Sequence, residues 1–416
     1  MNKISILLAL SLISLDANAD IKTYLKKAHD ISAEVKANQQ DLKSAKVNYA
    51  QTYAQMLPTV TAGGTRNKIN RKDSGVENHD MYNTKSITIS QNLFRGGGNI
   101  SNIMLGRLQN EIAKHTYRNT DQNFFLNSAA TYLGYILALE QYKVAEISER
   151  ALAKYLESTD LRFKLGEVTK TDVAQAQSRY SMAQSEKIKY KGALDTAMAN
   201  FARVFGEEAS KEVKMPSFPN NIPADYDESL RIARQNNLEV LIADLQVKAA
   251  SEGIKINWSK ILPSLDFQGT VAKTEGSRYT NNRLDKSLVL SLSIPLFQNG
   301  SEYLNILNSH YTRDKARFLY NETLKQLATK VNSAWVNFTT SKSTVESAKA
   351  TVESATMAYD GVQEEAKIGL KTTLDVLNAE QELFQARLAL LNAEYQSILA
   401  SYQLLVIVGT FNLSAI

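Results

Sequence analysis

The residue types that could perform chemistry are scattered along this chain of 416 residues. The chain has no cysteine, which excludes thiol catalysis, a disulfide scaffold and Cys-based zinc sites. The run Gly96-Gly97-Gly98 lacks the Gly-Lys-Ser/Thr ending of a phosphate-binding loop and indicates instead a flexible joint between a strand and a helix. Metal-ligand spacing is missing among the four histidines, which are His29, His79, His115 and His310. The sequence therefore predicts no enzyme, and no catalytic, metal-binding or cofactor-binding residue.

Two polar stretches do recur with a fixed spacing. One reads Arg162-Phe163-x-x-Gly166-x-x-x-x-Thr171-Asp172-Val173-x-x-Ala176, and its echo reads Gly369-x-x-x-x-Leu374-Asp375-Val376-x-x-Ala379. We interpret each as a turn that leads into a helix, where a carboxylate interacts favourably with the N-terminal dipole. Asp172 and Asp375 are therefore candidates for a charged site, and simple helix capping is the alternative role for both.

These stretches belong to a longer internal repeat. Leu93-Phe94-Arg95-Gly96-Gly97 recurs as Leu296-Phe297-Gln298-Asn299-Gly300, and Lys164-Leu165-Gly166 recurs as Lys367-Ile368-Gly369. Both pairs are displaced by 203 residues, and one displacement that links two distant landmarks indicates a duplication. We expect repeat 1 to span 20–215 and repeat 2 to span 216–416.

The first 19 residues predict a secretory signal peptide. Lys3 precedes an apolar stretch from Ile4 to Leu15, and Ala17-Asn18-Ala19 has the small-x-small pattern of a cleavage site. A buried N-terminal helix is the alternative. No run of 18 or more apolar residues follows, so no transmembrane helix is predicted. The exported protein is expected either to be soluble in the periplasm or to span an outer membrane as β-strands. Its net charge of +5 is modest and spread along the chain, which gives no indication of nucleic-acid binding.

Proline placement predicts long helices. No proline occurs in 59–215 or 296–416, and a proline inside a helix costs about 3 kcal/mol. The shorter helices carry apolar residues at alternating spacings of three and four, from Val173 to Val204 and from Val376 to Ile407, which is typical of a coiled coil. An ordinary antiparallel bundle is the alternative. The expected helices are an N-terminal helix, 99–163, 172–205, 238–261, 301–368 and 375–411, with tip turns at 164–171 and 369–374.

Alternating apolar and polar residues predict four strands in two hairpins, at 58–96 and 263–297. We expect their polar loops at about 70–83 and 274–285. Alternation of this kind suits an outer-membrane barrel, yet four strands cannot close one, and open edges are not tolerated in lipid. Three chains would supply twelve strands and leave a lumen. Hairpins that decorate the edge of a soluble protein are the alternative.

With these features the chain resembles the TolC family of outer-membrane efflux and secretion ducts over nearly its whole mature length. The resemblance rests on the duplicated helix–hairpin–helix plan, the Leu-Pro pairs at 57–58 and 262–263, the Leu-Phe-x-x-Gly step after each second strand, and the two turn motifs. It implies a mainly α fold with membrane β-structure, in which a long α-helical barrel continues a 12-stranded trimeric β-barrel. A small mixed belt would come from 206–236 and the C-terminal stretch.

The same resemblance implies that the two tip turns converge at the closed periplasmic end of the duct. Asp375, present three times around the axis, would form an acidic ring that attracts cations. Asn378 stands where the family often has a second acidic residue, so we expect weaker cation binding. Lys371 corresponds to a basic residue that ties neighbouring helices together in the closed state, with Thr171 and Asp172 as its expected partners. A solvated turn lysine is the alternative for Lys371.

The resemblance also implies partners. These are two further copies of the chain, the lipid of the outer membrane, a periplasmic adaptor (membrane fusion) protein, and an inner-membrane transporter of the RND or ABC class. The residues expected to dock the adaptor are Leu165, Gly166, Glu167, Ile368, Gly369 and Leu370. The function expected is a duct with porin activity for multidrug efflux or type I protein secretion. A coiled-coil structural protein, such as an adhesin stalk, and a periplasmic adaptor are the alternatives.

Overall fold

The computed structural model describes residues 21–73, 76–210, 213–219, 221–278 and 281–412, so the expected signal peptide at 1–19 lies outside the described residues. The chain divides into two compact units. The first, which we call the helical unit, comprises Met1–Lys36, Thr120–Asn237 and Leu327–Ile416. The second, the sheet unit, comprises Ala37–Asn119 and Leu238–Gln326. The mainly helical architecture with four strands that the sequence predicts is confirmed.

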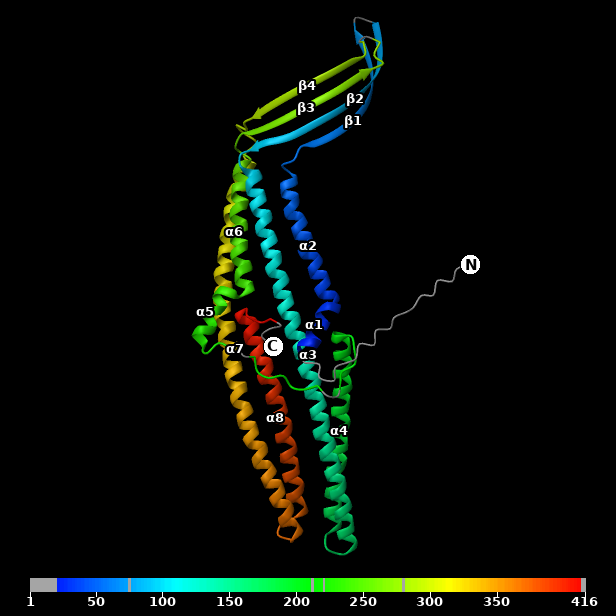
Figure 1. Cartoon of the computed structure of the whole chain (residues 1–416), viewed down its shortest axis with the longest axis vertical. Coiled ribbons are helices and arrows are strands. Elements are labelled where there is room, and N and C mark those ends of the chain that lie inside the picture. The colour runs from blue at the N-terminus through cyan, green and yellow to red at the C-terminus, as the bar shows by residue number, and fades with distance from the viewer. Residues whose placement is uncertain (1–20, 74–75, 211–212, 220, 279–280, 413–416) are drawn as a thin grey trace, which may run out of the picture. The chain divides into compact units, whose positions relative to one another are not determined.

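The sheet unit contains one four-stranded antiparallel sheet. Its strands are β1 (Thr59–Asp73), β2 (Val76–Arg95), β3 (Ser264–Glu275) and β4 (Arg283–Ser293). They lie side by side in the order β1-β2-β3-β4, which leaves β1 and β4 at the edges (Figure 1). The unit also holds most of α2 (Ala33–Ala54), all of α6 (Leu238–Ser259), and the first parts of α3 (Gly98–Lys164) and α7 (Ser301–Lys367).

The pairing register gives the sheet two chemically different faces. Along residues 81–90 of β2, exposed and half-buried side chains alternate strictly, because successive side chains point to opposite faces. The residues that share one face, which we call the apolar face, are largely apolar over its helix-proximal part. They include Val60, Ala62, Ile87, Ile89, Phe267, Val271, Leu288, Leu290 and Leu292.

The opposite face, which we call the polar face, is lined by hydroxyl, amide and carboxylate groups. The side chains of Thr84 and Thr274 lie 3.4 Å apart across the strand pair, and those of Thr88 and Thr270 lie 3.3 Å apart. On the same face, the Asn92 amide donates to the Asp266 carboxylate at 2.7 Å. The alternation predicted from the sequence therefore separates a polar from an apolar surface.

The hairpin loops are shorter than the sequence suggests. The expected loops at 70–83 and 274–285 are wrong in extent, because the β1–β2 ladder continues to the pair Asp73 and Val76, and the β3–β4 ladder continues to Thr274 and Arg283. Apolar alternation fades in these outer parts, but strand pairing depends on backbone hydrogen bonds, which polar residues form equally well. The strands thus extend past the region that their apolar residues mark.

The joint from β2 into α3 is closely packed, in contrast to the flexible joint expected from Gly96-Gly97-Gly98. Gly96 has a φ of 55°, in the left-handed region that favours glycine. A Cβ added to Gly96 would lie 2.6 Å from the Cβ of Leu262 and 2.7 Å from the carbonyl oxygen of Ser259. The glycine is therefore required by the approach of α6, not by mobility.

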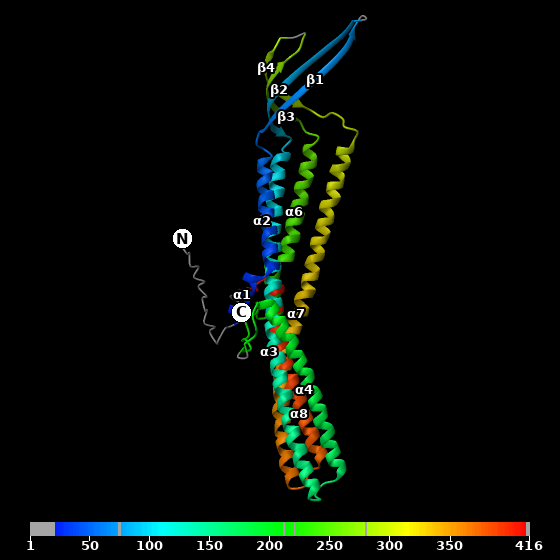
Figure 2. The ribbon, with the colours of Figure 1, turned by 90° about the vertical axis from the view of Figure 1, so that its right-hand side faces the viewer.

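The helical unit is built from α1 (Ile21–Ile31), α4 (Lys170–Phe205), α5 (Tyr226–Asn236), α8 (Thr373–Val408) and the remainder of α3 and α7. Within it α3 runs beside α4, and α7 beside α8 (Figures 1 and 2). Its largest core joins α1, α3, α4 and α8 and is rich in aromatic rings. Phe201 lies 4.3 Å from Phe205 and 5.3 Å from both Tyr24 and Tyr135, measured between ring centroids.

Toward the turns, the part of the core that the structure describes includes two smaller clusters. One contains Ala145, Phe384 and Leu388, and the other contains Leu152, Ala183 and Leu377. Small residues from α3 and α4 meet larger ones from α8 in these clusters, so the helices can approach closely. The described helices also come in pairs of equal length: 11 residues for α1 and α5, 22 for α2 and α6, 67 for α3 and α7, and 36 for α4 and α8.

In the part of the chain that the structure describes, no helix combines the length and the apolar character needed to cross a membrane.

Candidate functional site

The two turns singled out by the sequence close the helix pairs α3–α4 and α7–α8, and both are built in the same way. Gly166 and Gly369 each adopt a φ of 79° just after the preceding helix. The amide of Glu167 donates to the carbonyl of Arg162 at 2.9 Å, and the amide of Leu370 donates to that of Glu365 at 2.9 Å. This is the glycine-capped helix end known as the Schellman motif, which satisfies carbonyls that would otherwise lack donors.

Each turn leads into a capping box. Thr169 and Thr372 are the N-cap residues of α4 and α8, and each hydroxyl accepts from the backbone amide three residues later at 3.2 Å. The carboxylates of Asp172 and Asp375 reach back to the N-cap amides at 2.9 Å. Both aspartates therefore cap their helices, which is the alternative role that the sequence left open. A Thr-x-x-Asp spacing in the sequence is the signal for this arrangement.

The capping contacts hold both carboxylates in the ionised form. Hydrogen bonds from Thr169 lower the pKa of Asp172, with smaller contributions from the Thr373 hydroxyl and the charge of Arg162. Hydrogen bonds from Thr372 lower the pKa of Asp375, and the charge of Lys371 acts in the same direction. Two negative charges therefore persist at the turns under mildly acidic conditions.

The expected gate residues are divided between the two turns. Asp172 and Thr171 lie in the first turn of α4, whereas Lys371 directly precedes the N-cap of α8. Within the described part of a single chain, Lys371 and Asp172 form no ion pair, and Lys371 acts on Asp375 of its own turn. A contact between Lys371 and a neighbouring chain stays a prediction.

The tips expose apolar side chains. Leu165 is 76% exposed, Ile368 is 73% exposed and Leu370 is 70% exposed. Glu167, the acidic member of the first tip, pairs with Arg162 at 3.2 Å. Exposed aliphatic residues at the end of a helical hairpin contribute nothing to the packing of a single chain, so they are available to a partner.

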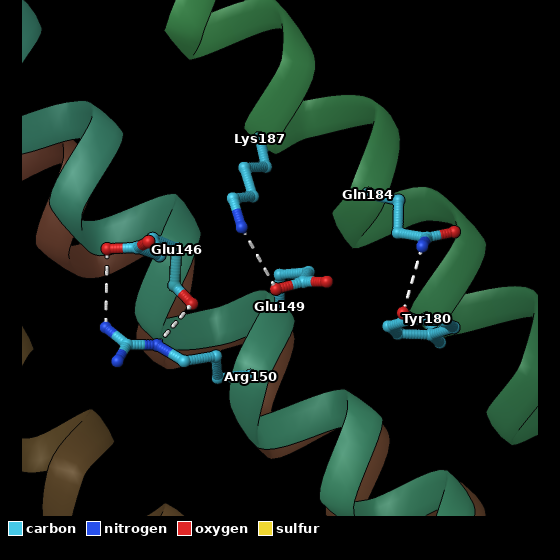
Figure 3. A network of polar contacts seen from close by, with 6 residues as sticks. All are labelled: Glu146, Glu149, Arg150, Tyr180, Gln184 and Lys187. Carbon is cyan, nitrogen blue, oxygen red and sulfur yellow. Dashed lines mark hydrogen bonds and ion pairs between the residues drawn. The ribbon is translucent and has the colours of Figure 1, made fainter.

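Above the turns, polar contacts tie α3 to α4 (Figure 3). Lys187 occupies one position of the three-and-four spacing that runs from Val173 to Val204, and it pairs with Glu149 of α3 at 3.4 Å. The contacts on either side stay within one helix: Arg150 pairs with Glu146 at 3.4 Å, and the Gln184 amide donates to the Tyr180 hydroxyl at 2.9 Å. The acidic partner on the facing helix explains why a lysine can occupy a position in this otherwise apolar spacing.

Two contacts with α8 escaped the sequence analysis. The guanidinium of Arg179 donates to the Asn378 side-chain oxygen at 2.9 Å and links α4 to α8. Two residues further along α8, the hydroxyl of Ser148 on α3 donates to the carboxyl group of Glu380, a residue that is only 8% exposed. Burial raises the pKa of Glu380, while the Ser148 hydroxyl and the charges of Arg179 and Arg387 oppose the rise. A glutamate between the apolar positions of an otherwise buried helix face was the available signal.

A groove and a cavity lie in this part of the helical unit. A groove of about 1120 Å³ is bordered by α3, α7 and the start of α8, and its polar lining includes Tyr155, Arg162, Glu167, Tyr359 and Lys367. A smaller cavity of about 220 Å³ lies beside Glu380. Among the described residues, no group of three histidine, aspartate or glutamate side chains is placed to hold a metal ion. The polar contacts described here link neighbouring helices.

The profile of the outer membrane efflux protein family matches residues 24–207 and 230–410, which is most of the chain. The two matched segments include both helical turns and both hairpins.

Individual relatives agree with this match. The chain is 26% identical over 388 residues to the outer membrane efflux protein BepC of Brucella suis, covering 92% of this chain and 83% of BepC. It is 25% identical over 312 residues to the outer membrane protein TolC of Escherichia coli, covering 71% of this chain and 63% of that protein. It is 23% identical over 362 residues to the alkaline protease secretion protein AprF of Pseudomonas aeruginosa, covering 85% of this chain and 73% of AprF.

A solved structure shares the fold. The Campylobacter jejuni CmeC outer membrane channel superposes with a TM-score of 0.83 at 15% identity, covering 95% of this chain and 86% of CmeC. At 15% identity this similarity supports the fold alone. The assignment to a family rests on the match to the family profile. The chain therefore belongs to the outer membrane efflux protein family, and it is an outer-membrane protein that acts in efflux.

Proposed function

We propose that three copies of this chain form one duct that carries substrates from an inner-membrane transporter across the periplasm and the outer membrane. The observation that carries the proposal is the four-stranded sheet with one apolar and one polar face and two free edges, β1 and β4. Edge strands in lipid must be paired, and a four-stranded sheet cannot close on itself. Three such sheets give a 12-stranded barrel with an apolar outside and a polar, water-filled inside.

The helices continue this duct as a long α-helical barrel that arises from an internal duplication. Repeat 1 spans 20–215 and repeat 2 spans 216–416, after removal of a signal peptide at 1–19. Support comes from the equal lengths of the four helix pairs. It also comes from the identical capping boxes and from the glycine helix ends at Gly206 and Gly409, which lie 203 residues apart. Each repeat supplies one hairpin to the barrel and one helical hairpin to the duct.

The tip turns form the periplasmic gate. Three Asp375 carboxylates make an acidic ring, and their lowered pKa keeps the ring charged. Asn378, one turn further on, is engaged by Arg179 and adds no second ring of negative charge. Lys371 pairs with Thr171 and Asp172 of the neighbouring helix hairpin and holds the closed state.

The exposed tips dock a periplasmic adaptor, which links the duct to an RND or ABC transporter. The apolar side chains of Leu165, Ile368 and Leu370 supply the contact, and Gly166 and Gly369 fix the turns that present them. Glu167 adds a charge at the rim. The names of BepC and AprF associate relatives with efflux and with protease secretion, so we propose multidrug efflux or type I protein secretion as the process served.

Single-channel recording in planar bilayers tests the duct and its gate. The unaltered protein is expected to form channels, and Lys371→Glu is expected to raise their conductance, because the charge reversal places two acidic groups against each other. Thr169→Ala is the matched control, since it removes the N-cap hydroxyl next to Asp172 without changing any charge. An unaltered protein that forms no channels contradicts the duct. Channels of equal conductance in Lys371→Glu contradict only the gate contact.

A further inference from the structure

The apolar face of the sheet changes character toward the hairpin loops. There every strand contributes at least one basic side chain to this face, and β1 also carries Lys68 two residues beyond Arg66. Four of them form a row across the sheet. We call these four residues the basic band: Arg66 on β1, Lys85 on β2, Lys273 on β3 and Lys286 on β4. All four are exposed. The band lies in one unit of the structure, so its register is fixed by the strand pairing itself.

The register places the four residues in a row across the sheet. Lys85 stands directly opposite Lys273. Arg66 lies two residues beyond Gly64, the partner of Lys85, and is therefore a diagonal neighbour of Lys85. Lys286 is the partner of Val271 and is a diagonal neighbour of Lys273 in the same way. Diagonal neighbours on one face lie about 7–8 Å apart, within the reach of long side chains.

This row is electrostatically unbalanced. Like charges directly opposite each other destabilise a strand pair, and Lys85 and Lys273 are such a pair. Among the strand side chains that the structure describes on this face, the one carboxylate is that of Glu275, which pairs with Lys273 at 2.6 Å. The five lysine and arginine side chains described on this face, the band and Lys68, thus share one described anion. A row of cations that the sheet itself does not neutralise is complementary to an external anion.

The apolar residues next to the band identify the surroundings of that anion. From Lys85 to Phe94 the chain advances nine residues, or about 31 Å at ~3.4 Å per residue, which covers about 23 Å of height at a ~40° strand tilt. An outer-membrane barrel presents an apolar belt about 25 Å tall. Phe94 and Phe297, both exposed, lie at the helix end of this stretch. The basic band therefore lies at the level where hydrocarbon gives way to headgroups.

We propose that the basic band binds the phosphate groups of anionic lipid headgroups in the leaflet that faces the hairpin loops. The inference rests on the proposed membrane barrel and adds a ligand class to its outer surface. Continuity with the apolar belt argues for a lipid, because a nucleic acid or an acidic peptide would not use the neighbouring aliphatic surface. Long basic side chains suit this position, since their alkyl stems cover apolar surface while their charged ends reach the phosphates.

Lipid retention by the purified protein in uncharged detergent tests the proposal. The probe is diphosphoryl lipid A, compared with its dephosphorylated form and with inorganic phosphate at the same concentration. Bound lipid is counted by native mass spectrometry. The unaltered protein is expected to retain the diphosphoryl form and to lose it as salt is raised, because charge contacts at a surface are screened. The proposal is overturned if the dephosphorylated lipid is retained equally well, or if retention does not fall as salt is raised.

The variant Lys85→Gln with Lys286→Gln removes two cations and leaves the Lys273–Glu275 pair in place. It is expected to weaken retention about thirtyfold, since each basic residue near an anionic surface contributes about a factor of five. Lys85→Arg with Lys286→Arg is expected to retain lipid. Arg283→Gln is the matched control, because Arg283 lies on the polar face and pairs with Asp285 at 2.9 Å.

The outcomes separate this inference from the proposed function. A Gln variant that runs as a trimer and retains lipid like the unaltered protein overturns the basic band and leaves the duct intact. If equimolar inorganic phosphate displaces the lipid, the basic band binds free phosphate, and the proposal of a lipid ligand is wrong. If the Gln variant does not assemble, the proposal is tested by lipid retention in the Arg variant and by the salt titration of the unaltered protein. Both proteins keep the four positive charges of the band. A protein that is monomeric without detergent contradicts the duct itself.

Discussion

Glu380 is the residue at which burial and charge conflict most strongly in the helical unit. Its carboxyl group is nearly enclosed between α3 and α8, and a single hydroxyl, that of Ser148, donates to it. Burial of a carboxylate favours the protonated form, and the raised pKa of Glu380 reflects this. The other charged or polar groups around the same cavity are Ser148, Thr356, Tyr359, Asp360 and Arg387, with Arg179 acting from α4.

We predict that Glu380→Gln stabilises the protein at neutral pH. The pKa of Glu380 is higher in the folded than in the unfolded state. The stability that its protonated form contributes is therefore fully present below about pH 4, near the pKa of an exposed glutamate, and is lost as the pH rises through the folded-state pKa. The amide keeps an acceptor for Ser148 without a buried charge, so the gain should be roughly 1–2 kcal/mol near pH 7 and small near pH 4. Urea denaturation at both pH values measures it.

The exposed Glu382 on the same helix provides the control. Glu382→Gln should leave the denaturation midpoint almost unchanged at both pH values, because an exposed carboxylate loses little hydration on folding. If Glu380→Gln shifts the midpoint equally at both pH values, the effect comes from packing, and the account of a buried charge is wrong.

At the scale of single elements, glycine helix ends set where the helices stop. Gly369 and Gly409 follow α7 and α8 with φ values of 79° and 82°. A Cβ on Gly369 would meet nothing within 4 Å, whereas one on Gly409 would lie 2.4 Å from the carbonyl oxygen of Asn236. Gly409 therefore serves two purposes, a left-handed turn and a close approach of α8 to the end of α5, while Gly369 serves only the first.

We predict that alanine at these two glycines has unequal costs. Gly369→Ala should destabilise by about 1 kcal/mol, which is the strain of an L-residue in the left-handed region. Gly409→Ala adds a collision with backbone that cannot rotate away, so its cost should reach roughly 2–4 kcal/mol. Thermal unfolding of the two variants beside the unaltered protein measures the difference. Equal losses would show that the contact with Asn236 relaxes freely.

The elements were predictable to different degrees for physical reasons. Long proline-free stretches and alternating residues suffice to predict the helices and four strands, because both patterns reflect burial on one side. The outer parts of β1 and β2 were missed, since strand pairing beyond the apolar belt depends on backbone groups that leave no alternating pattern. In the same way, the sequence pointed to Asp172 and Asp375 but not to the Ser148–Glu380 contact, which joins residues 232 positions apart.

At the scale of the whole molecule, the proposed barrel makes a geometric demand on β1 and β4. Within one chain these strands are separated by two others, so facing positions lie about 14 Å apart at ~4.8 Å per strand. A disulfide needs Cα atoms within about 7 Å. Cysteines placed on β1 and β4 therefore cannot join within a chain, but in a closed trimer β1 of one chain lies beside β4 of the next.

We predict that Thr61→Cys on β1, combined in turn with Ser287→Cys, Val289→Cys and Ser291→Cys on β4, yields oxidised dimers and trimers for at least one pair. The absence of native cysteine leaves no competing thiol. Thr84→Cys with Thr274→Cys, which face each other in the β2–β3 ladder, should close within one chain and give a monomer band, and Thr61→Cys alone should give no ladder. Denaturing electrophoresis without reductant separates the monomer, dimer and trimer bands of all these variants. If the β2–β3 pair oxidises while every β1–β4 pair stays monomeric, the edges do not meet, and the twelve-stranded barrel is wrong.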